Sequence, residues 1–179
     1  MKHAPVVSSL SLLCLLFASP GETTTIKRMD LAEMAQKAGF IFRGTVVEVD
    51  KGSITTSGHK IPIITYQIRV AEQLKGRFPA ASGGATMLTI RSVNMKVIEL
   101  PQLIVGQEYL LLTTTPSSIG LSTVVGLGQG VFRLYGDGNT QLAVNGLSNQ
   151  GLAPGVRGPV PYDDLVERIL SSMRKGERK

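Results

Sequence analysis

The segment from Ile64 to Val70 alternates apolar and polar residues, and this pattern constrains the fold more than any other in the chain. The apolar positions are Ile64, Tyr66, Ile68 and Val70, and the polar positions between them are Thr65, Gln67 and Arg69. A period of two residues is typical of a β-strand with one buried face. We therefore predict a strand here, with its apolar side chains facing a hydrophobic core.

The chain has 20 glycines and nine prolines, which favour turns. We predict further strands where short apolar segments lie between such turns. The predicted strands are Phe40–Asp50, Ala85–Val93, Glu108–Thr115, Val131–Tyr135 and Gln141–Val144. Gly44 is expected to form a bulge that bends the first of these strands. The run Leu110–Leu112 predicts a strand covered on both sides. Asp137-Gly138 predicts a hairpin turn, whereas Lys51–Lys60 is expected to be a polar loop.

Two helices are predicted to flank the strands. Asp30 is the expected N-cap of a short first helix, with Glu33 as its capping-box partner and Gly39 as a left-handed C-terminal residue. A last helix is expected from about Pro161 to Met173, with acidic residues near its start and basic residues near its end, as the helix dipole favours. Its apolar face consists of Leu165, Val166, Ile169, Leu170 and Met173. We expect this face to pack on the strands; the alternative is that the helix rests on an anionic membrane.

These elements predict an all-β fold that is rich in strands and has two flanking helices. We expect a small OB-like antiparallel barrel of five to six strands, closed or nearly closed, because closure removes exposed sheet edges. The predicted domain organisation is a signal peptide at 1–21, a barrel domain with its N-terminal helix at 22–145, a Gly/Pro linker at 146–160, and an amphipathic helix with a basic tail at 161–179.

Residues 1–21 have the pattern of a secretory signal peptide, in which a short basic start precedes 13 uncharged residues from Val6 to Ala18. The expected cleavage site lies before Glu22. Two alternatives are a buried N-terminal helix and a lipoprotein acylated at Cys14. Cleavage would remove the only cysteine of the chain. We therefore expect an extracytoplasmic protein, periplasmic or secreted, that has no disulfide bond.

The positive charge of the chain is concentrated at its C-terminus. After cleavage, 18 basic and 13 acidic residues remain, a net charge of +5, and +4 of this falls within the last twelve residues. Nucleic-acid binding requires basic and aromatic residues that are spread over one face of the fold. We therefore expect no nucleic-acid partner, whereas the basic tail suggests peripheral contact with a membrane surface.

Candidate catalytic residues are few. After cleavage His59 is the only histidine, and a Ser-His-Asp triad would have to combine it with Ser53 or Ser57 from the same polar segment. We expect His59 to be solvated rather than catalytic. A structural zinc site needs about four Cys or His ligands, which the mature chain does not have.

Two further motifs are interpreted as structural. Glu48 and Asp50 lie on one side of a predicted strand end, where they could share a Ca²⁺ ion with Asp137 or Asn139, but we expect them to be solvated. The stretch Gly126–Gly130 resembles a phosphate loop, yet a predicted strand follows it instead of a helix, so we expect a bend or bulge. We predict no catalytic, cofactor-binding or metal-binding residue and no cofactor.

Four short segments between about residues 30 and 135 carry a family resemblance. They are Gly44–Val49, Thr65–Gly76, Val105–Leu110 and Gly126–Phe132. They resemble a broad group of exported bacterial proteins with an OB-like barrel, which is similar in shape to the tissue inhibitors of metalloproteinases. Those inhibitors act through an N-terminal cysteine that chelates the zinc of the protease. Because the mature chain has no cysteine, the resemblance implies a fold and assigns no site residue.

The expected function is that of an exported, non-enzymatic binding module, inhibitor-like toward another extracytoplasmic protein. Its contact surface would be Lys51–Lys60 and Ser117–Gly126, because loops at the end of a barrel can vary without disturbing the core. The alternative is an envelope-associated structural protein that uses its basic C-terminal helix, and an enzyme is the third candidate. We expect a monomer or a weak oligomer.

Overall fold

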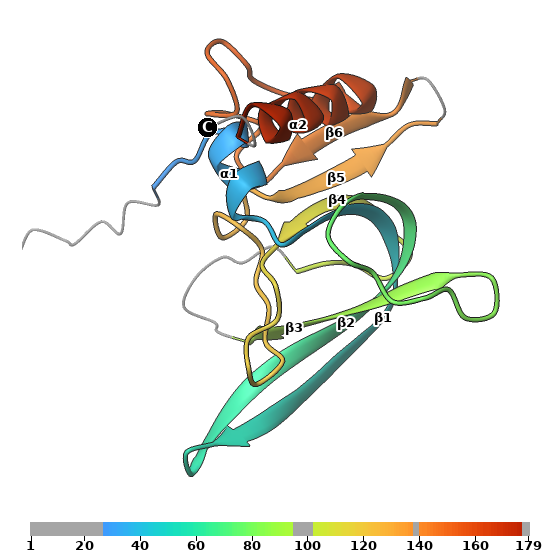
Figure 1. The fold of residues 1–179 in the computed structure, drawn as a ribbon, viewed down its shortest axis with the longest axis vertical. Coiled ribbons are helices and arrows are strands. Elements are labelled where there is room, and N and C mark those ends of the chain that lie inside the picture. Colours follow the sequence, from blue (N-terminus) through green and yellow to red (C-terminus); the bar gives the residue numbers. More distant parts are fainter. Residues whose placement is uncertain (1–26, 95–101, 138–139, 177–179) are drawn as a thin grey trace, which may run out of the picture.

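The structure, a computed structural model, describes residues 27–94, 102–137 and 140–176. One antiparallel sheet carries two helices on one of its faces (Figure 1). The strands are β1 (Phe40–Thr56), β2 (His59–Lys75), β3 (Thr86–Val93), β4 (Glu108–Thr113), β5 (Val131–Tyr135), β6 (Leu142–Asn145) and β7 (Val160–Pro161). The helices are α1 (Leu31–Lys37) and α2 (Tyr162–Gly176). The predicted β-rich fold with two flanking helices is confirmed, and the signal peptide predicted at 1–21 lies outside the described residues.

The sheet is open. Its strands follow the order β3-β2-β1-β4-β5-β6-β7, so the predicted closed barrel of five to six strands is not confirmed. In the described part of the chain, the irregular segment 122–125 lies between β3 and β4 in place of a closing ladder. The Ser122 N–H donates to the Arg91 carbonyl of β3 at 2.8 Å, and the Val125 N–H donates to the Leu112 carbonyl of β4 at 2.9 Å. The Thr114 N–H also donates to the Thr123 carbonyl at 2.9 Å, so a few hydrogen bonds and one isolated bridge cover the gap without making a continuous sheet.

The bulge predicted at Gly44 is wrong, because the extra residue at the register shift there is Ala71 of β2, and the extra residue of β1 is Val47. The register between β1 and β2 shifts between Arg43 and Gly44, and shifts again at two nearby positions. A Cβ atom at Gly44 would lie 2.6 Å from the Arg69 carbonyl oxygen, so a larger residue would push β2 away. β1 pairs with β4 near its start and with β2 along almost its whole length.

Two hydrophobic cores lie on opposite faces of the sheet, and β4 contributes to both. Its three leucines, Leu110, Leu111 and Leu112, are fully buried, which confirms the prediction of a strand covered on both sides. The core beneath the helices contains Leu110 and Leu112 with Met34, Ile41, Phe132, Leu165 and Ile169. The second core contains Leu111 with Phe42, Val46, Tyr66, Ile68 and Ile90.

The first helix begins as predicted but ends differently. The Glu33 N–H donates to Asp30 Oδ1 at 2.7 Å, so Asp30 is the N-cap. The prediction that Gly39 is a left-handed C-terminal residue is wrong, because the C-cap is the preceding residue, in an extended conformation with φ −68°. Gly39 is instead required by a close approach: a Cβ atom there would lie 2.6 Å from the backbone nitrogen of Thr115.

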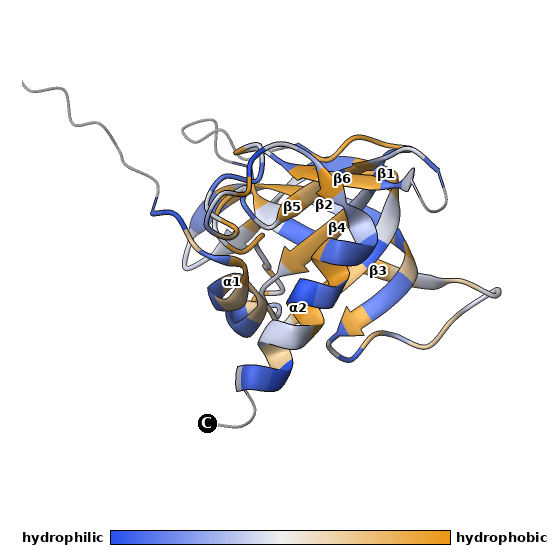
Figure 2. Cartoon of the chain, turned by 90° about the horizontal axis from the view of Figure 1, so that it is seen from above, coloured by the Kyte–Doolittle hydropathy of each residue, from blue (hydrophilic) through white to orange (hydrophobic). Residues whose placement is uncertain are grey.

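The second helix packs its apolar face against the sheet. Tyr162, Leu165 and Ile169 are buried, and Val166 and Met173 pack against the same core. Figure 2 shows α2 lying across the strands, with hydrophilic residues toward its C-terminal end. The predicted apolar face is therefore occupied by contacts within the fold. No helix of the described residues is long and apolar enough to cross a membrane.

Residues 146–160, predicted to be a linker, form successive turns around the buried side chain of Asn149. Its Nδ2 donates to the Ala143 and Gly158 carbonyls, both at 2.9 Å, and its Oδ1 accepts the Asn145 N–H at 2.9 Å. This one buried amide satisfies three backbone polar groups, so the segment follows a defined path into β7 and α2.

The prediction of a polar loop at Lys51–Lys60 is wrong. β1 continues to Thr56 and β2 begins at His59, so these residues extend a hairpin. Its turn residues, Ser57 and Gly58, have φ values of 48° and 75°. Two positive φ values are typical of a type I′ turn, whose twist matches that of the strands. The sequence gives no strand signal here because both faces of the hairpin are solvated, so no apolar alternation marks it.

Candidate binding surface

The end of the β1–β2 hairpin projects beyond the rest of the sheet (Figure 1). We call residues 51–62 the arm. None of them is buried, and only Ile54, Thr56 and Ile61 are half-buried. β3 pairs with β2 only from Ile63 onward, so the arm itself has two strands. The arm is therefore a slender projection with an accessible backbone.

One edge of β1 is unpaired along the arm. β4 pairs with β1 only from Phe40 to Thr45. Two further bonds follow: the Gly106 N–H donates to the Val46 carbonyl at 2.8 Å, and the Val46 N–H donates to the Gln107 carbonyl at 3.2 Å. Beyond Val46, no other described segment forms a backbone hydrogen bond with this side of β1. We call Val49–Thr55 on this side the free edge.

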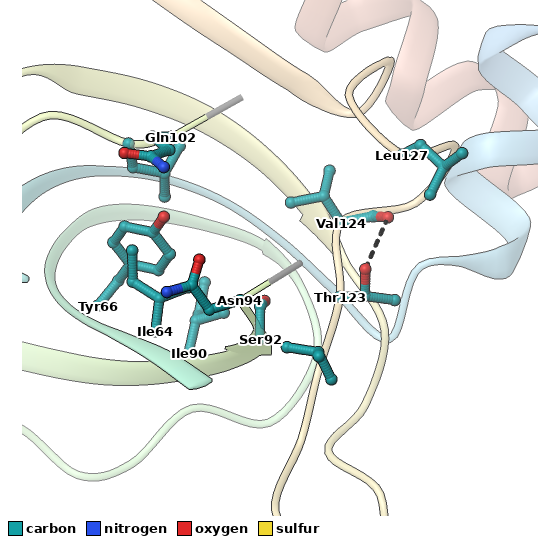
Figure 3. Close-up of a pocket in the computed structure, with 11 residues that line it drawn as sticks. Ile64, Tyr66, Ile90, Ser92, Asn94, Gln102, Thr123, Val124 and Leu127 are labelled. Atoms are coloured by element: carbon teal, nitrogen blue, oxygen red, sulfur yellow. Dashed lines mark hydrogen bonds between the residues drawn. The ribbon is translucent and has the colours of Figure 1, made fainter. Parts of the chain in front are cut away.

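A small apolar pocket lies between the base of the arm and residues 123–127. Figure 3 shows Ile64, Tyr66 and Ile90 on one side of it and Val124 and Leu127 on the other. Burial raises the pKa of the Tyr66 phenol above its ordinary value. The cavity measures about 50 Å³, whereas sites for drug-sized ligands measure about 300–1,000 Å³. The pocket is too small to enclose such a ligand.

The second predicted contact segment, Ser117–Gly126, divides into an exposed tip and a structural base. At the tip, the Gly120 N–H donates to the Ser117 carbonyl at 2.8 Å, and Ile119 is 45% exposed. The base is segment 122–125, which bridges β3 and β4 as described above. The tip and the arm both lie in the lower half of Figure 1, so the fold brings the two predicted contact segments to the same side of the molecule.

The residues considered for a catalytic triad all belong to the arm. His59 is exposed at the start of β2, opposite Thr56, and Ser57 is a turn residue. Ser53 lies opposite Pro62. No ion pair or hydrogen bond between His59 and a carboxylate is present among the described residues. The structure therefore places these side chains along a solvated hairpin and gives His59 no carboxylate to orient it.

The acidic residues considered for Ca²⁺ binding lie beside the arm. Glu48 and Asp50 are exposed and occupy one face of β1, opposite Gln67 and Thr65. Within the described ranges, no group of three or more His, Cys, Asp or Glu side chains is arranged to hold a metal ion. Asn139 lies outside the described residues. Glu48 and Asp50 thus provide a small patch of negative charge next to the free edge.

The glycine-rich stretch Gly126–Gly130 is a turn that leads directly into β5, as predicted. Its buried Gln129 side chain holds the turn to the N-terminal segment. Gln129 Oε1 accepts the Met29 N–H at 2.9 Å, and Gln129 Nε2 donates to the Lys27 and Gly126 carbonyls, both at 3.0 Å. These contacts give the stretch a structural role.

A polar cluster that no sequence motif predicts lies at the start of α2. Arg43 Nε is 3.5 Å from the Glu72 carboxylate and 3.7 Å from the Glu108 carboxylate. The Tyr162 hydroxyl donates to Glu72 at 2.6 Å, and Gln141 Nε2 donates to Glu108 at 2.9 Å. The Arg43 guanidinium also lies 5.2 Å from the centroid of the Tyr162 ring. The cluster joins β1, β2 and β4 to α2, and the only sequence signal for it is a lone arginine within an apolar strand.

Comparison with known proteins does not identify a function for these surfaces. No family model matches the chain, and no curated protein matches it. Function is therefore inferred from the arm, the free edge and the distribution of charge.

Proposed function

We propose that this protein is an exported, non-enzymatic binding module, inhibitor-like toward another extracytoplasmic protein, and that the arm is its main contact element. The observation that carries the proposal is the arm itself: twelve residues without a buried side chain extend beyond the cores. A protein that needed these residues only for stability would gain little from them, because they bury almost no apolar surface. The exposed tip of the Ser117–Gly126 segment on the same side of the fold supports a contact surface there.

The proposal is tested by affinity capture from the extracytoplasmic fraction of the source cells. A shortened variant replaces residues 53–62 by Asn-Gly, which joins Gly52 to Ile63 through a two-residue turn. We expect the wild-type chain to retain a specific protein and the shortened variant to lose it. The thermal unfolding midpoint should stay close to that of the wild type, because the deleted residues contribute nothing to either core. Equal retention by both chains would contradict the proposed role of the arm.

The alternative function, an envelope-associated structural protein, would use the end of α2. Arg174 and Lys175 lie in its last turn. Because the apolar face of α2 packs on the sheet, contact with an anionic lipid or wall polymer would depend on these charges and not on apolar insertion. Deleting residues 174–179 should then abolish sedimentation with anionic vesicles and leave capture by the arm unchanged. Sedimentation that survives the deletion would contradict this alternative.

We also propose that β1 to β5 belong to an OB-like barrel of the kind found in the exported bacterial proteins that the sequence resembles. Two observations support this. The β1–β2 register shifts at Gly44 while β1 pairs with both β2 and β4, and segment 122–125 hydrogen-bonds to both β3 and β4. Slow amide exchange of Ser122 and Val125 in solution would agree with a nearly closed barrel. Rapid exchange of both amides would contradict it.

A further inference from the structure

We propose that the free edge of β1 binds an extended, basic segment of the partner protein as an additional strand of the sheet. This inference rests on the proposed function and specifies the partner's chemistry. Strand addition uses backbone hydrogen bonds for affinity and alternate side chains for specificity.

The hydrogen-bond pattern identifies the backbone groups that are available. Val46 directs its N–H and carbonyl toward the Ile104–Gln107 turn and therefore away from β2. Its partner on β2 is Ile68, and Glu48 pairs with the next residue of β2, Gln67, so Val47 is an extra residue that shifts the alternation by one; the register is regular from Glu48 to Thr56. In an antiparallel ladder the backbone N–H and carbonyl of successive residues point alternately toward and away from the neighbouring strand. We call a residue of β1 outward when its N–H and carbonyl point away from β2, and every second residue of this part of β1 is outward. The outward residues are Val49, Lys51, Ser53 and Thr55.

Pro62 gives an independent check of this assignment. It pairs with Ser53, and its carbonyl accepts the Asn94 N–H at 2.9 Å on the β3 side, away from β1. A residue of β2 whose backbone faces β1 donates its N–H to β1, and a proline has no N–H to donate. The backbone of Pro62 therefore faces away from β1. Ser53 must therefore also point away from β2, in agreement with the pattern counted from Val46.

The free edge is long enough for a specific strand. Outward groups recur every two residues, roughly 6.8 Å apart, so four such residues extend over roughly 20 Å. An extended segment of about seven residues matches this length. Each outward residue offers one N–H and one carbonyl, which no described segment uses.

Side chains beside the edge indicate what the added strand carries. Glu48 and Asp50 lie exposed on one face of β1, and neither forms an ion pair within the described residues. Ile104 and Val105, which are 59% and 56% exposed, lie in the turn that hydrogen-bonds to Val46 at the start of the edge. The complementary strand therefore has Lys or Arg on the face of the two carboxylates, uncharged residues on the opposite face, where exposed Lys51 lies, and apolar residues at the end near this turn.

A second copy of the chain fits the edge less well. Two identical antiparallel edges that pair in one sheet are related by a two-fold axis, which places one residue opposite itself. Registers centred on Asp50 or Lys51 oppose like charges directly, which destabilises a sheet. A register centred on Gly52 leaves both acidic side chains opposite uncharged residues. A basic strand from another protein can place a positive charge opposite each of the two carboxylates, which these self-paired registers do not.

The test uses the purified protein and a synthetic ten-residue peptide in which Lys alternates with Thr and the last two residues are Val and Ile. A second peptide has Glu in place of each Lys. We expect the Lys peptide to slow amide hydrogen exchange at Val49, Lys51, Ser53 and Thr55, while Asp50 and Gly52, which already bond to β2, change little. The wild-type protein should bind the Glu peptide about tenfold more weakly than the Lys peptide. Asp50→Lys should reduce or reverse this difference in affinity between the two peptides.

Ser53→Pro and Ser53→Ala form the matched pair of variants. Proline removes the outward N–H and leaves the β1–β2 ladder intact, whereas alanine removes only the side chain. We expect Ser53→Pro to lower the affinity for the Lys peptide by about tenfold, because the variant loses one hydrogen bond and adds a steric clash. Ser53→Ala should change this affinity little. Thr55→Pro repeats the test at the next outward residue if Ser53→Pro fails to fold.

Three outcomes would overturn strand addition: no slowing of exchange at the four amides, equal binding of both peptides, or equal binding by both Ser53 variants. Self-association that Ser53→Pro abolishes would overturn the assignment of the edge to another protein and indicate a second copy. If the arm-dependent capture succeeds while these tests fail, the partner binds arm side chains, and the proposed function stands without strand addition. If the peptides bind as expected but capture does not depend on the arm, the proposed function fails on its own.

Discussion

Tyr162 is the residue through which α2 meets the polar cluster. Its ring is buried, and its hydroxyl donates to the Glu72 carboxylate at 2.6 Å. Burial raises the pKa of the phenol, and the hydrogen bond and negative charge of Glu72 raise it further, while Arg43 opposes the shift. The folded state therefore holds the phenol proton at a pH where an unfolded chain, with an ordinary pKa of about 10, has lost it.

This difference predicts a pH-dependent effect of Tyr162→Phe. Below about pH 10 the hydroxyl is protonated in both states, and its removal should cost about 1 kcal/mol for the hydrogen bond to the partly exposed carboxylate. Above that pH the unfolded state binds fewer protons than the folded state, so the free energy of unfolding of the wild type falls as pH rises. The difference between wild type and Tyr162→Phe should therefore shrink in urea titrations from about pH 9 to 11. A difference that stays constant would contradict the raised pKa.

Two glycines of β1 offer a second comparison between single residues. A Cβ atom at Gly44 meets the Arg69 carbonyl at 2.6 Å, whereas a Cβ atom at Gly52 meets nothing within 4 Å. Gly44→Ala should therefore destabilise the fold by about 1–3 kcal/mol through overpacking. Gly52→Ala, the matched control, should be neutral or slightly stabilising. Chemical denaturation measures both, and equal effects would show that β2 moves away from Gly44 without cost.

At the scale of elements, the arm depends on its turn. Ser57 and Gly58 both have positive φ, which serine adopts less readily than asparagine. Ser57→Asn should stabilise the turn by a few tenths of a kcal/mol, and Gly58→Ala should destabilise it by about 1 kcal/mol. Ser57→Asn should therefore slow amide exchange in the arm, and Gly58→Ala should speed it. Changes of similar size in α2 would contradict this, because the arm contacts neither core.

Elements with an apolar face were predictable, and those without one were not. The alternation at Ile64–Val70, the run Leu110–Leu112 and the cap at Asp30 each carry a local signal, and each forms as predicted. The arm was missed because its residues are solvated on both faces, so hydrophobic periodicity cannot mark it. Gly39 was misassigned because its role is a close approach to Thr115, a contact 76 residues away in sequence that local patterns do not encode.

The candidate surfaces were predictable only in location. Lys51–Lys60 was named as a contact segment, yet the feature that makes it a surface, an unpaired strand edge, depends on where β4 stops pairing with β1. The Arg43 cluster could not be predicted because its members come from five separate parts of the chain. Only the fold brings the Glu72 and Glu108 carboxylates to either side of one guanidinium.

For the whole molecule, the two cores should unfold as one unit, because β4 supplies side chains to both. Leu111 faces the core around Phe42, and its neighbours Leu110 and Leu112 face the core beneath α2. Leu111→Ala should cost about 2–5 kcal/mol, whereas Leu127→Ala, at a position that is 38% exposed, should cost about 0.5 kcal/mol or less. If β4 couples the cores, Leu111→Ala speeds amide exchange in α2 as much as in β3, although α2 does not touch the mutated side chain. Faster exchange in β3 alone would mean that each face of the sheet opens independently, and that the helices could stay folded while the arm and its base come apart.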